Sequence, residues 1–281
     1  MSKIVISADS AVDLSNELCE KYDVKVFGMT IVMGEEQRTD GVDVHTTDVF
    51  DYVKRTGTLT STSAGSIGEY EDYFTKLTAD GSAVVHFSLG NEFSSTHRNA
   101  VLAGEEVENV FVVDSANLST GIGLLVLKAC DMRSEGMSAQ EIAENIAKIT
   151  DKVRTSFVLD TLDYMKKGGR CSSVAALGAN LLKLKPCIAV VDGKMGVEKK
   201  YRGKISEVYK QYVKEHLPEK SNLDTTRVFV THTCVYDDSA KQIVELVREL
   251  DLFDEVLETT AGSTVSVHCG PNTLGVLFIE K

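Results

Sequence analysis

Apolar, strand-like runs alternate with helix-like runs through the first 150 residues, and this alternation constrains the fold more than any other feature. Strands that alternate with helices predict a parallel, doubly wound sheet. Ligands of such sheets bind beyond the carboxyl ends of the strands. Here those ends are rich in hydroxyl groups: Asp9-Ser10, residues 88–95 and Asp114-Ser115. The expected strands are 3–9, 24–32, 83–89 and 109–113, and the expected helices are 13–22, 46–53, 68–77, 96–103, 118–133 and 138–153.

The second half has a different pattern. Residues 186–191 and 195–200 read as two strands joined at Asp192-Gly193, a strong hairpin signal. Further strands are expected at 157–159, 227–231, 256–259 and 274–279, and helices at 175–184, 204–216 and 239–250. This pattern predicts a mixed sheet with helices on one side and with 274–279 as a central strand. The fold class is therefore α/β with two domains, residues 1–154 and 155–281.

Charge and composition exclude several classes of protein. A net charge of −12 argues against a general binder of nucleic acids or anionic membranes, whose phosphates would repel the chain. The sequence has no long uncharged apolar run for stable membrane insertion, and Met1-Ser2-Lys3 leads directly into a strand, so we expect a cytoplasmic protein. Six cysteines and six histidines show no CxxC, HxH or HExxH spacing, so we expect reduced thiols and no metal site.

The segment LDYMKKGGRCSS, residues 162–173, places three cations around Gly168-Gly169. Paired glycines allow a tight turn with a positive φ. One interpretation is a helix that ends at the glycines, with basic residues complementing its dipole. The other is an anion site made by cations beside free backbone amides. Both can hold at once.

No nucleotide-binding or catalytic motif occurs in the sequence, so the candidate site residues are hydroxyls, one histidine and two arginines. Hydroxyls and an imidazole are suited to binding a carboxylate. Each candidate also has a plain structural interpretation. Thr62 and Ser63 fit a polar loop over 58–66, Ser94 and Ser95 fit helix caps, His268 fits an exposed Gly-rich loop, and Arg202 fits a surface cation.

Six short motifs follow one another along the chain. The first three are Asp9-Ser10 with Asp13-Leu14, the stretch TSAGSIGEY at 62–70 and FSST at 93–96. The other three are Asp114-Ser115, LDYMKKGGR at 162–170 and HCGPNTLG at 268–275. In this order they resemble the motifs of the DegV family of bacterial fatty-acid-binding proteins, and the resemblance covers the whole chain.

This resemblance implies a Rossmann-like N-terminal domain, a C-terminal α/β domain and a fatty acid between them. Its carboxylate would be bound by Thr62 and Ser94, with Ser63, Ser95 and His268 close by. Members of the family act as a non-catalytic carrier that presents the carboxylate to an ATP-binding fatty acid kinase subunit. Acyl phosphate for phospholipid synthesis forms on the carrier, and no cofactor is implied. Arg170 and Arg202 would serve partner docking or phosphoryl transfer.

Three departures from the family pattern bear on acyl-chain selectivity: Gly65, Gly90-Asn91 and Ser95. Two other functions remain open at this point. One is a stand-alone enzyme acting on a small carboxylated or phosphorylated metabolite. The other is a regulatory sensor of acyl-chain supply, which is compatible with the carrier.

Overall fold

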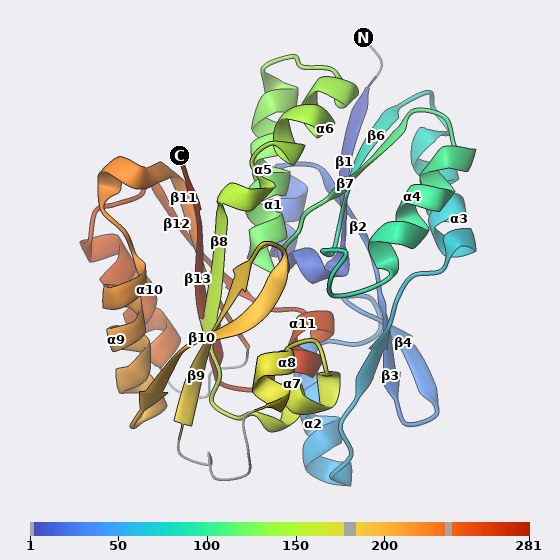
Figure 1. Ribbon diagram of the computed structural model, residues 1–281. Helices are drawn as coiled ribbons and strands as arrows, with labels where there is room; N and C mark the ends of the chain where they lie inside the picture. Colours follow the sequence, from blue (N-terminus) through green and yellow to red (C-terminus); the bar gives the residue numbers. More distant parts are fainter. Residues whose placement is uncertain (1–2, 177–183, 234–237) are drawn as a thin grey trace.

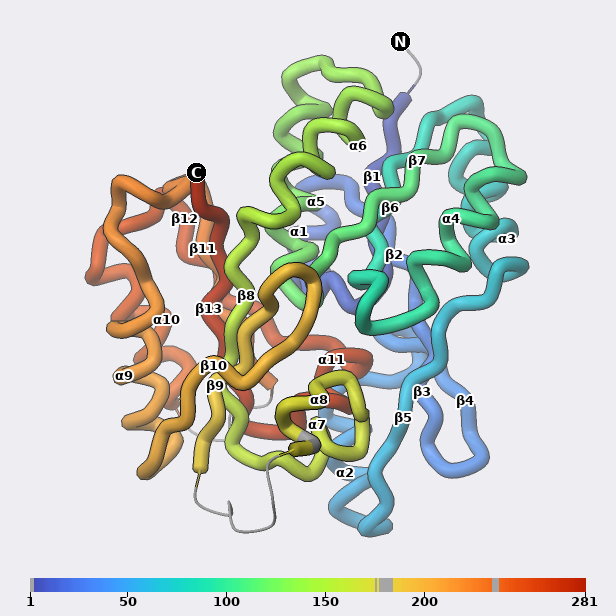
Figure 2. Tube along the Cα trace, viewed as in Figure 1, coloured from blue at the N-terminus to red at the C-terminus, as the bar shows by residue number. Residues whose placement is uncertain are grey.

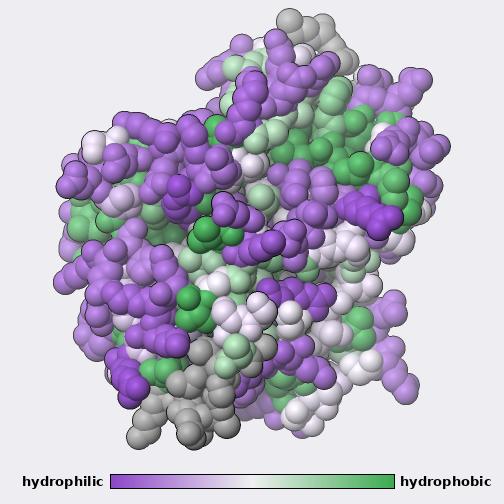
Figure 3. Space-filling model, in the orientation of Figure 1, coloured by the Kyte–Doolittle hydropathy of each residue, from purple (hydrophilic) through white to green (hydrophobic). Residues whose placement is uncertain are grey.

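The computed structural model describes residues 3–176, 184–233 and 238–281. In Figure 1 the parallel sheet lies at the upper right and the mixed sheet at the left, and a cluster of short helices and a small third sheet lie below the parallel sheet. Hydrophilic residues cover much of the face shown in Figure 3. Within the described residues, no helix is long and apolar enough to cross a membrane.

The first sheet is parallel, as the alternation predicts. Its strand order is β2-β1-β6-β7, and its strands are β1 (Ile4–Asp9), β2 (Val24–Phe27), β6 (Ala83–Ser88) and β7 (Val110–Asp114). The two central strands, β1 and β6, are buried along almost their whole length, because helices cover both faces. Their carboxyl ends point towards the second half of the chain.

The helices around this sheet follow the predicted positions closely. On one face, α3 (Ile67–Thr78) and α4 (Thr96–Glu106) pack Tyr70, Phe74 and Ala100 against the strands. The other face is covered mainly by α5 (Thr120–Ser134), which is buried on all sides. Next to it lie α1 (Asn16–Lys21), which Ser15 caps, and α6 (Ala139–Ala147). The helix predicted over 138–153 ends earlier, because a 3₁₀ turn at Thr150–Lys152 leads into a strand.

The second sheet is mixed, with the strand order β10-β9-β8-β13-β11-β12. Residues 274–279 are central, as predicted, because β13 pairs with both β8 and β11. The hairpin at Asp192-Gly193 joins β9 to β10. The helices α9 (Ile205–His216) and α10 (Ser239–Glu249) cover one face, while α5 packs against the other. The strands are β8 (Val153–Val158), β9 (Leu184–Val191), β10 (Lys194–Arg202), β11 (Leu223–Thr233), β12 (Glu255–Thr260) and β13 (Thr273–Glu280).

The single strand expected over 24–32 is wrong, because the chain changes sheets at Gly28. There β2 ends, and β3 (Thr30–Met33) begins a separate antiparallel sheet with the order β4-β3-β5. A side chain at position 28 would overlap Thr39 of β4 (Glu36–Thr39), so only glycine allows this close approach. The loop expected over 58–66 is also partly wrong, because Ser61–Ser63 form β5 and pair with β3.

A cluster of short helices below the parallel sheet and beside the mixed sheet combines both halves of the chain (Figure 2). It contains α2 (Thr46–Thr56), α7 (Asp163–Gly168), α8 (Ser172–Ala175) and α11 (Ser263–Cys269). Although it lies near the C-terminus, α11 packs against α2, β3 and β5 from the first half. The helix expected over 175–184 lies mostly outside the described residues.

Candidate functional site

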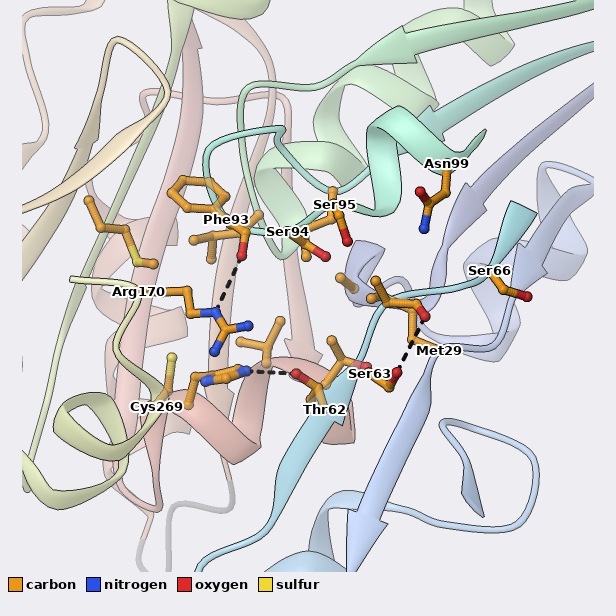
Figure 4. Close-up of a pocket in the computed structure, with 18 residues that line it drawn as sticks. Met29, Thr62, Ser63, Ser66, Phe93, Ser94, Ser95, Asn99, Arg170 and Cys269 are labelled. Atoms are coloured by element: carbon orange, nitrogen blue, oxygen red, sulfur yellow. Dashed lines mark hydrogen bonds between the residues drawn. The ribbon is translucent and has the colours of Figure 1, made fainter. Parts of the chain in front are cut away.

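A cavity of about 450 Å³ lies between the two halves of the molecule (Figure 4). Short segments from both halves line it, including β5, the loop before α4, the turn after α7, β10 and α11. Its volume falls in the range of roughly 300–1,000 Å³ that is typical of small-molecule sites. Both polar and apolar side chains line it, and its polar end is the part around Thr62 and His268.

The polar end is built around Thr62 and His268, which come from opposite halves of the chain. The Thr62 hydroxyl and the His268 Nε2 atom form a hydrogen bond of 3.0 Å, drawn as a dashed line in Figure 4. The prediction of a loop for each residue is wrong: Thr62 lies on β5, and His268 lies in the last turn of α11. Both residues are therefore placed by regular backbone hydrogen bonding, which fixes their separation.

The imidazole of His268 is buried and kept neutral. Burial lowers its pKa to about 4, and the charge of Arg170 contributes to the same shift. Its Nδ1 atom has no hydrogen-bond partner among the described residues, and a side chain at Gly168 would overlap this ring. Gly168 is therefore needed because the imidazole lies directly against its backbone.

Arg170 lies at the mouth of the cavity and bridges two of its walls. Its Nη1 donates to the Gly168 carbonyl at 2.6 Å, and its Nε donates to the Phe93 carbonyl at 3.4 Å. The predicted helix end is confirmed, because Gly169 caps α7 with a φ of 68°. This turn directs the Arg170 guanidinium towards the polar end of the cavity, as Figure 4 shows.

The hydroxyl groups before α4 form the third polar wall. The Ser94 hydroxyl accepts a hydrogen bond from the Thr96 amide at 3.2 Å, which leaves its own proton free to donate. Ser95 occupies the N-cap position of α4, but its side chain makes no capping hydrogen bond. Asn99, one turn into α4, also lines the cavity and donates to the Gly65 carbonyl at 2.7 Å. The sequence reasoning missed Asn99, which looks like an ordinary helix residue.

A buried network around Asp9 positions this wall. The carboxylate accepts from the Leu89 amide at 2.7 Å, from the Tyr70 hydroxyl and from His86 Nε2 at 3.2 Å. The Tyr70 hydroxyl also lies 2.6 Å from Thr96 Oγ1. Because Asp9 is fully buried and every contact spans a different element, the loop after β6 is fixed relative to α3 and β1.

The rest of the cavity lining is mostly apolar and comes from both halves of the chain. A second, small cavity of about 20 Å³, lined by Phe157 and Leu277, shares Leu118, Val265 and Cys269 with it. The apolar lining residues are Ala11, Met29, Leu89, Leu118, Met195, Val265 and Cys269. The sequence reasoning did not identify Met29 or Met195, although unbranched methionines adapt well to irregular apolar cavities.

Two of the predicted residues contribute less to this geometry, and only one of them lies outside the cavity. Ser63 lines the cavity, but its hydroxyl contacts only the neighbouring Ala64 carbonyl, at 3.5 Å, among the described residues. Arg202 is exposed at the end of β10 and does not line the cavity. The structure thus brings together Thr62, Ser63, Ser94, Ser95, His268 and Arg170, and it places Arg202 outside.

The arrangement favours binding of an amphiphilic anion. Hydroxyl groups, an imidazole and a guanidinium can satisfy a carboxylate, and the apolar lining can take a hydrocarbon tail. A nucleophile, a base and an orienting acid do not come together here, since no carboxylate contacts His268 Nδ1 within the described part of the chain.

Comparison with known proteins gives consistent matches along the whole chain. A family model described as "Uncharacterised protein, DegV family" matches residues 3–281. A DegV domain-containing protein from Clostridium acetobutylicum is 30% identical over 287 residues, which cover 100% of both chains.

Solved structures show the same fold. A fat acid (stearic acid)-binding protein from Eubacterium ventriosum is 28% identical, with a TM-score of 0.84 over 100% of this chain and 99% of that one. A fatty acid binding protein, DegV from Bacillus subtilis, is 25% identical, with a TM-score of 0.84 over 100% of both chains. The predicted two-domain α/β fold class is confirmed.

Proposed function

Since the chain belongs to the DegV family, we propose that it binds a long-chain fatty acid in the cavity between its sheets and presents the carboxylate to a separate kinase subunit. The names of the relatives from Eubacterium ventriosum and Bacillus subtilis, which describe fatty-acid binding, support the ligand class. The kinase subunit would supply ATP and form acyl phosphate on the bound chain.

The observation that carries the proposal is a cavity whose lining combines a polar cluster around Thr62 and His268 with apolar side chains. Burying a methylene group stabilises a complex by about 0.8 kcal/mol, so a tail of about sixteen carbons contributes on the order of 12 kcal/mol before costs. The tail therefore supplies most of the affinity, and the polar end fixes the orientation. We place the tail along the apolar lining towards the small cavity beside Phe157 and Leu277, which shares Leu118, Val265 and Cys269 with the main cavity.

The polar end offers donors suited to an ionised carboxylate. Thr62 and Ser94 can each donate a hydroxyl proton, while His268 Nε2 lies within hydrogen-bond distance of Thr62. Burying a carboxylate without partners would cost several kcal/mol, so these groups are required for binding. Ser63 and Ser95 lie beside them and complete the hydroxyl-lined mouth.

The carrier itself need not catalyse phosphoryl transfer. Arg170 is exposed at the mouth of the cavity, and Arg202 is exposed at the end of β10. Both side chains are therefore available to a partner surface. On a chain of net charge −12, such local cations can guide docking of an ATP-binding subunit.

Mass spectrometry of the freshly purified, denatured protein tests the ligand. We expect a co-purifying fatty acid, or uptake of one when the delipidated protein is incubated with a fatty-acid mixture. If neither occurs, the carrier function is wrong. Turnover of ATP or of an ester by the isolated chain would instead support the stand-alone enzyme.

The division between ligand binding and phosphoryl transfer is tested at Arg170. We expect Arg170→Ala to retain fatty acid but to yield less acyl phosphate with the partner kinase. Lys167→Ala, which removes an exposed cation near the end of the helix that precedes Arg170, is the matched control and should change neither. Loss of lipid from Arg170→Ala would refute the assigned division of roles.

A further inference from the structure

Three potential metal ligands converge on the face of the mixed sheet that lies away from the fatty-acid cavity. Cys187 of β9, Glu198 of β10 and His216 at the end of α9 place their ligand atoms within 4.8 Å of one another. Cys187 belongs to the core beneath α9 and α10, whereas its neighbour Ile188 faces the core shared with the first sheet. We propose that Cys187, Glu198 and His216 bind a divalent transition-metal ion of the zinc class. This site does not depend on the proposed lipid function.

The hydrogen bond at Nδ1 of His216 orients its other ring nitrogen, Nε2, towards Glu198 and Cys187. Its Nδ1 atom lies 3.1 Å from the Tyr212 carbonyl, which can only accept, so Nδ1 carries a proton. The Nε2 atom therefore presents its lone pair when the ring is neutral. It lies 2.7 Å from Glu198 Oε2 and 3.5 Å from Cys187 Sγ, both of which are also electron donors when ionised. A backbone carbonyl that orients a ligating histidine in this way is typical of metal sites.

A β-bulge directs Glu198 into the cluster. The pairing of β10 with β9 shifts between Val197 and Lys199, so Glu198 is the extra residue of the bulge. Val197 pairs with Ile188 and Lys199 pairs with Cys187, so Glu198 and Lys199 both lie opposite Cys187 across the bulge. Glu198 Oε2 thereby approaches Cys187 Sγ to 3.7 Å. Bulges commonly redirect a side chain next to a functional site.

The separations between ligand atoms fit tetrahedral zinc with one adjustment. Zinc bonds are about 2.3 Å long to sulfur and about 2.0–2.2 Å long to nitrogen and oxygen. In a tetrahedral site these lengths place sulfur about 3.6 Å from a nitrogen or oxygen ligand, and nitrogen about 3.4 Å from oxygen. Both sulfur distances already agree, at 3.5 and 3.7 Å. Only the contact between Glu198 and His216 must lengthen, and the Glu198 side chain is 49% exposed and able to move.

The surroundings leave the cluster available to a cation. Lys199 is the nearest competing cation on this strand, but its ammonium group lies 2.8 Å from Glu215, which also accepts from Tyr201. Glu198 and His216 line a cleft of about 760 Å³, which provides an entry path and room for a water molecule as fourth ligand. A site with three protein ligands and one open position is a known zinc arrangement.

The chemistry of the donors selects the ion. A thiolate with an imidazole favours zinc, cobalt or iron over magnesium or calcium, which prefer oxygen ligands. Cys187 is fully buried and burial raises its pKa, so a nucleophilic role does not fit. When the metal–sulfur bond forms, the thiol proton leaves to solvent, and the thiolate and carboxylate together balance the charge of the ion.

Cobalt(II) titration of the chelator-treated, reduced full-length protein tests the site, because cobalt bound to a thiolate gives a near-ultraviolet charge-transfer band. We expect this band in the wild type and its loss when zinc is added. Cys187→Ser should lack the band, whereas Cys130→Ser, which removes a buried cysteine of α5 outside the cluster, should retain it. No band in the wild type, or an unchanged band in Cys187→Ser, would overturn the proposal.

A second variant keeps the test decisive if Cys187→Ser does not fold. Glu198→Gln changes an exposed side chain and should lower the zinc affinity by more than about tenfold, as measured by calorimetry. Zinc binding to the wild type should also release a proton, so its enthalpy should depend on the ionisation enthalpy of the buffer. Equal affinities of Glu198→Gln and the wild type would contradict the ligand assignment.

Discussion

Adjacent glycines at the end of α7 offer a sharp test of the polar end of the cavity. Gly168 has no positive φ, so alanine is compatible with its backbone, but the new Cβ would overlap the His268 imidazole. The ring would have to move by roughly 1 Å to reach normal contact distances. Such a shift lengthens the 3.0 Å hydrogen bond to Thr62 beyond useful range.

The expected cost of Gly168→Ala follows from the hydrogen bonds lost. A bond to a charged group contributes about 1.5–3 kcal/mol, so losing the aligned imidazole should weaken fatty-acid binding by roughly 10- to 100-fold. The free energy of unfolding should fall little, because alanine favours a helix over glycine by about 1 kcal/mol. Displacement of a fluorescent fatty acid from the delipidated protein measures the first quantity, and urea unfolding measures the second.

Gly169→Ala is the matched control with the opposite expectation. Gly169 has a φ of 68°, and a methyl group at this position would meet no atom within 4 Å, so alanine there strains the backbone without touching the site. We expect a loss of about 1–2 kcal/mol in the free energy of unfolding and an unchanged affinity. If Gly168→Ala binds fatty acid like the wild type, or if the two variants behave alike, the assigned role of His268 is wrong.

Three further perturbations test the site and its support. The double variant Thr62→Ala, His268→Ala should lose fatty acid, seen by mass spectrometry, while circular dichroism stays unchanged; undiminished retention would remove both residues from the site. Tyr70→Phe removes the buried bonds to Asp9 and Thr96 and should lower the free energy of unfolding in urea by about 1–3 kcal/mol, whereas equal stability would contradict the network. Burial lowers the pKa of His268 to about 4 in the folded chain, against about 6.5 in the unfolded chain. The free energy of unfolding is therefore unaffected by this group above about pH 6.5, and it falls between about pH 6.5 and about pH 4, where mainly the unfolded chain binds the proton. Urea unfolding at pH 7 and pH 5 should therefore show a smaller pH dependence for His268→Gln than for the wild type, and identical dependence would refute this.

Local sequence patterns predicted the parts of the fold that depend on local interactions. The buried strands β1 and β6, the hairpin at Asp192-Gly193 and the cap at Gly169 all follow from short-range periodicity or turn chemistry. The break at Gly28 was missed, because the strand pattern continues across it and only the approach of Thr39 requires the glycine. Three-residue β5 was missed because its hydroxyl-rich composition is typical of a turn.

Sites that assemble from distant elements were harder to predict. The resemblance to a known family indicated Thr62, Ser94 and His268, but spacing alone could not pair residues that are 206 positions apart, as Thr62 and His268 are. The same limit hid Cys187, Glu198 and His216, which meet only because a bulge and a helix end converge. Asn99 and Met195 likewise gave no signal, because each looks like an ordinary helix or strand residue.

The position of α11 and β13 has a consequence for synthesis on the ribosome. His268 belongs to a helix that packs against elements from the first quarter of the chain, and residues 273–280 form a central strand of the mixed sheet. Until residues 263–280 have left the exit tunnel, a nascent chain therefore has neither a complete second sheet nor a complete cavity wall. The binding site can form only after both of these segments have emerged.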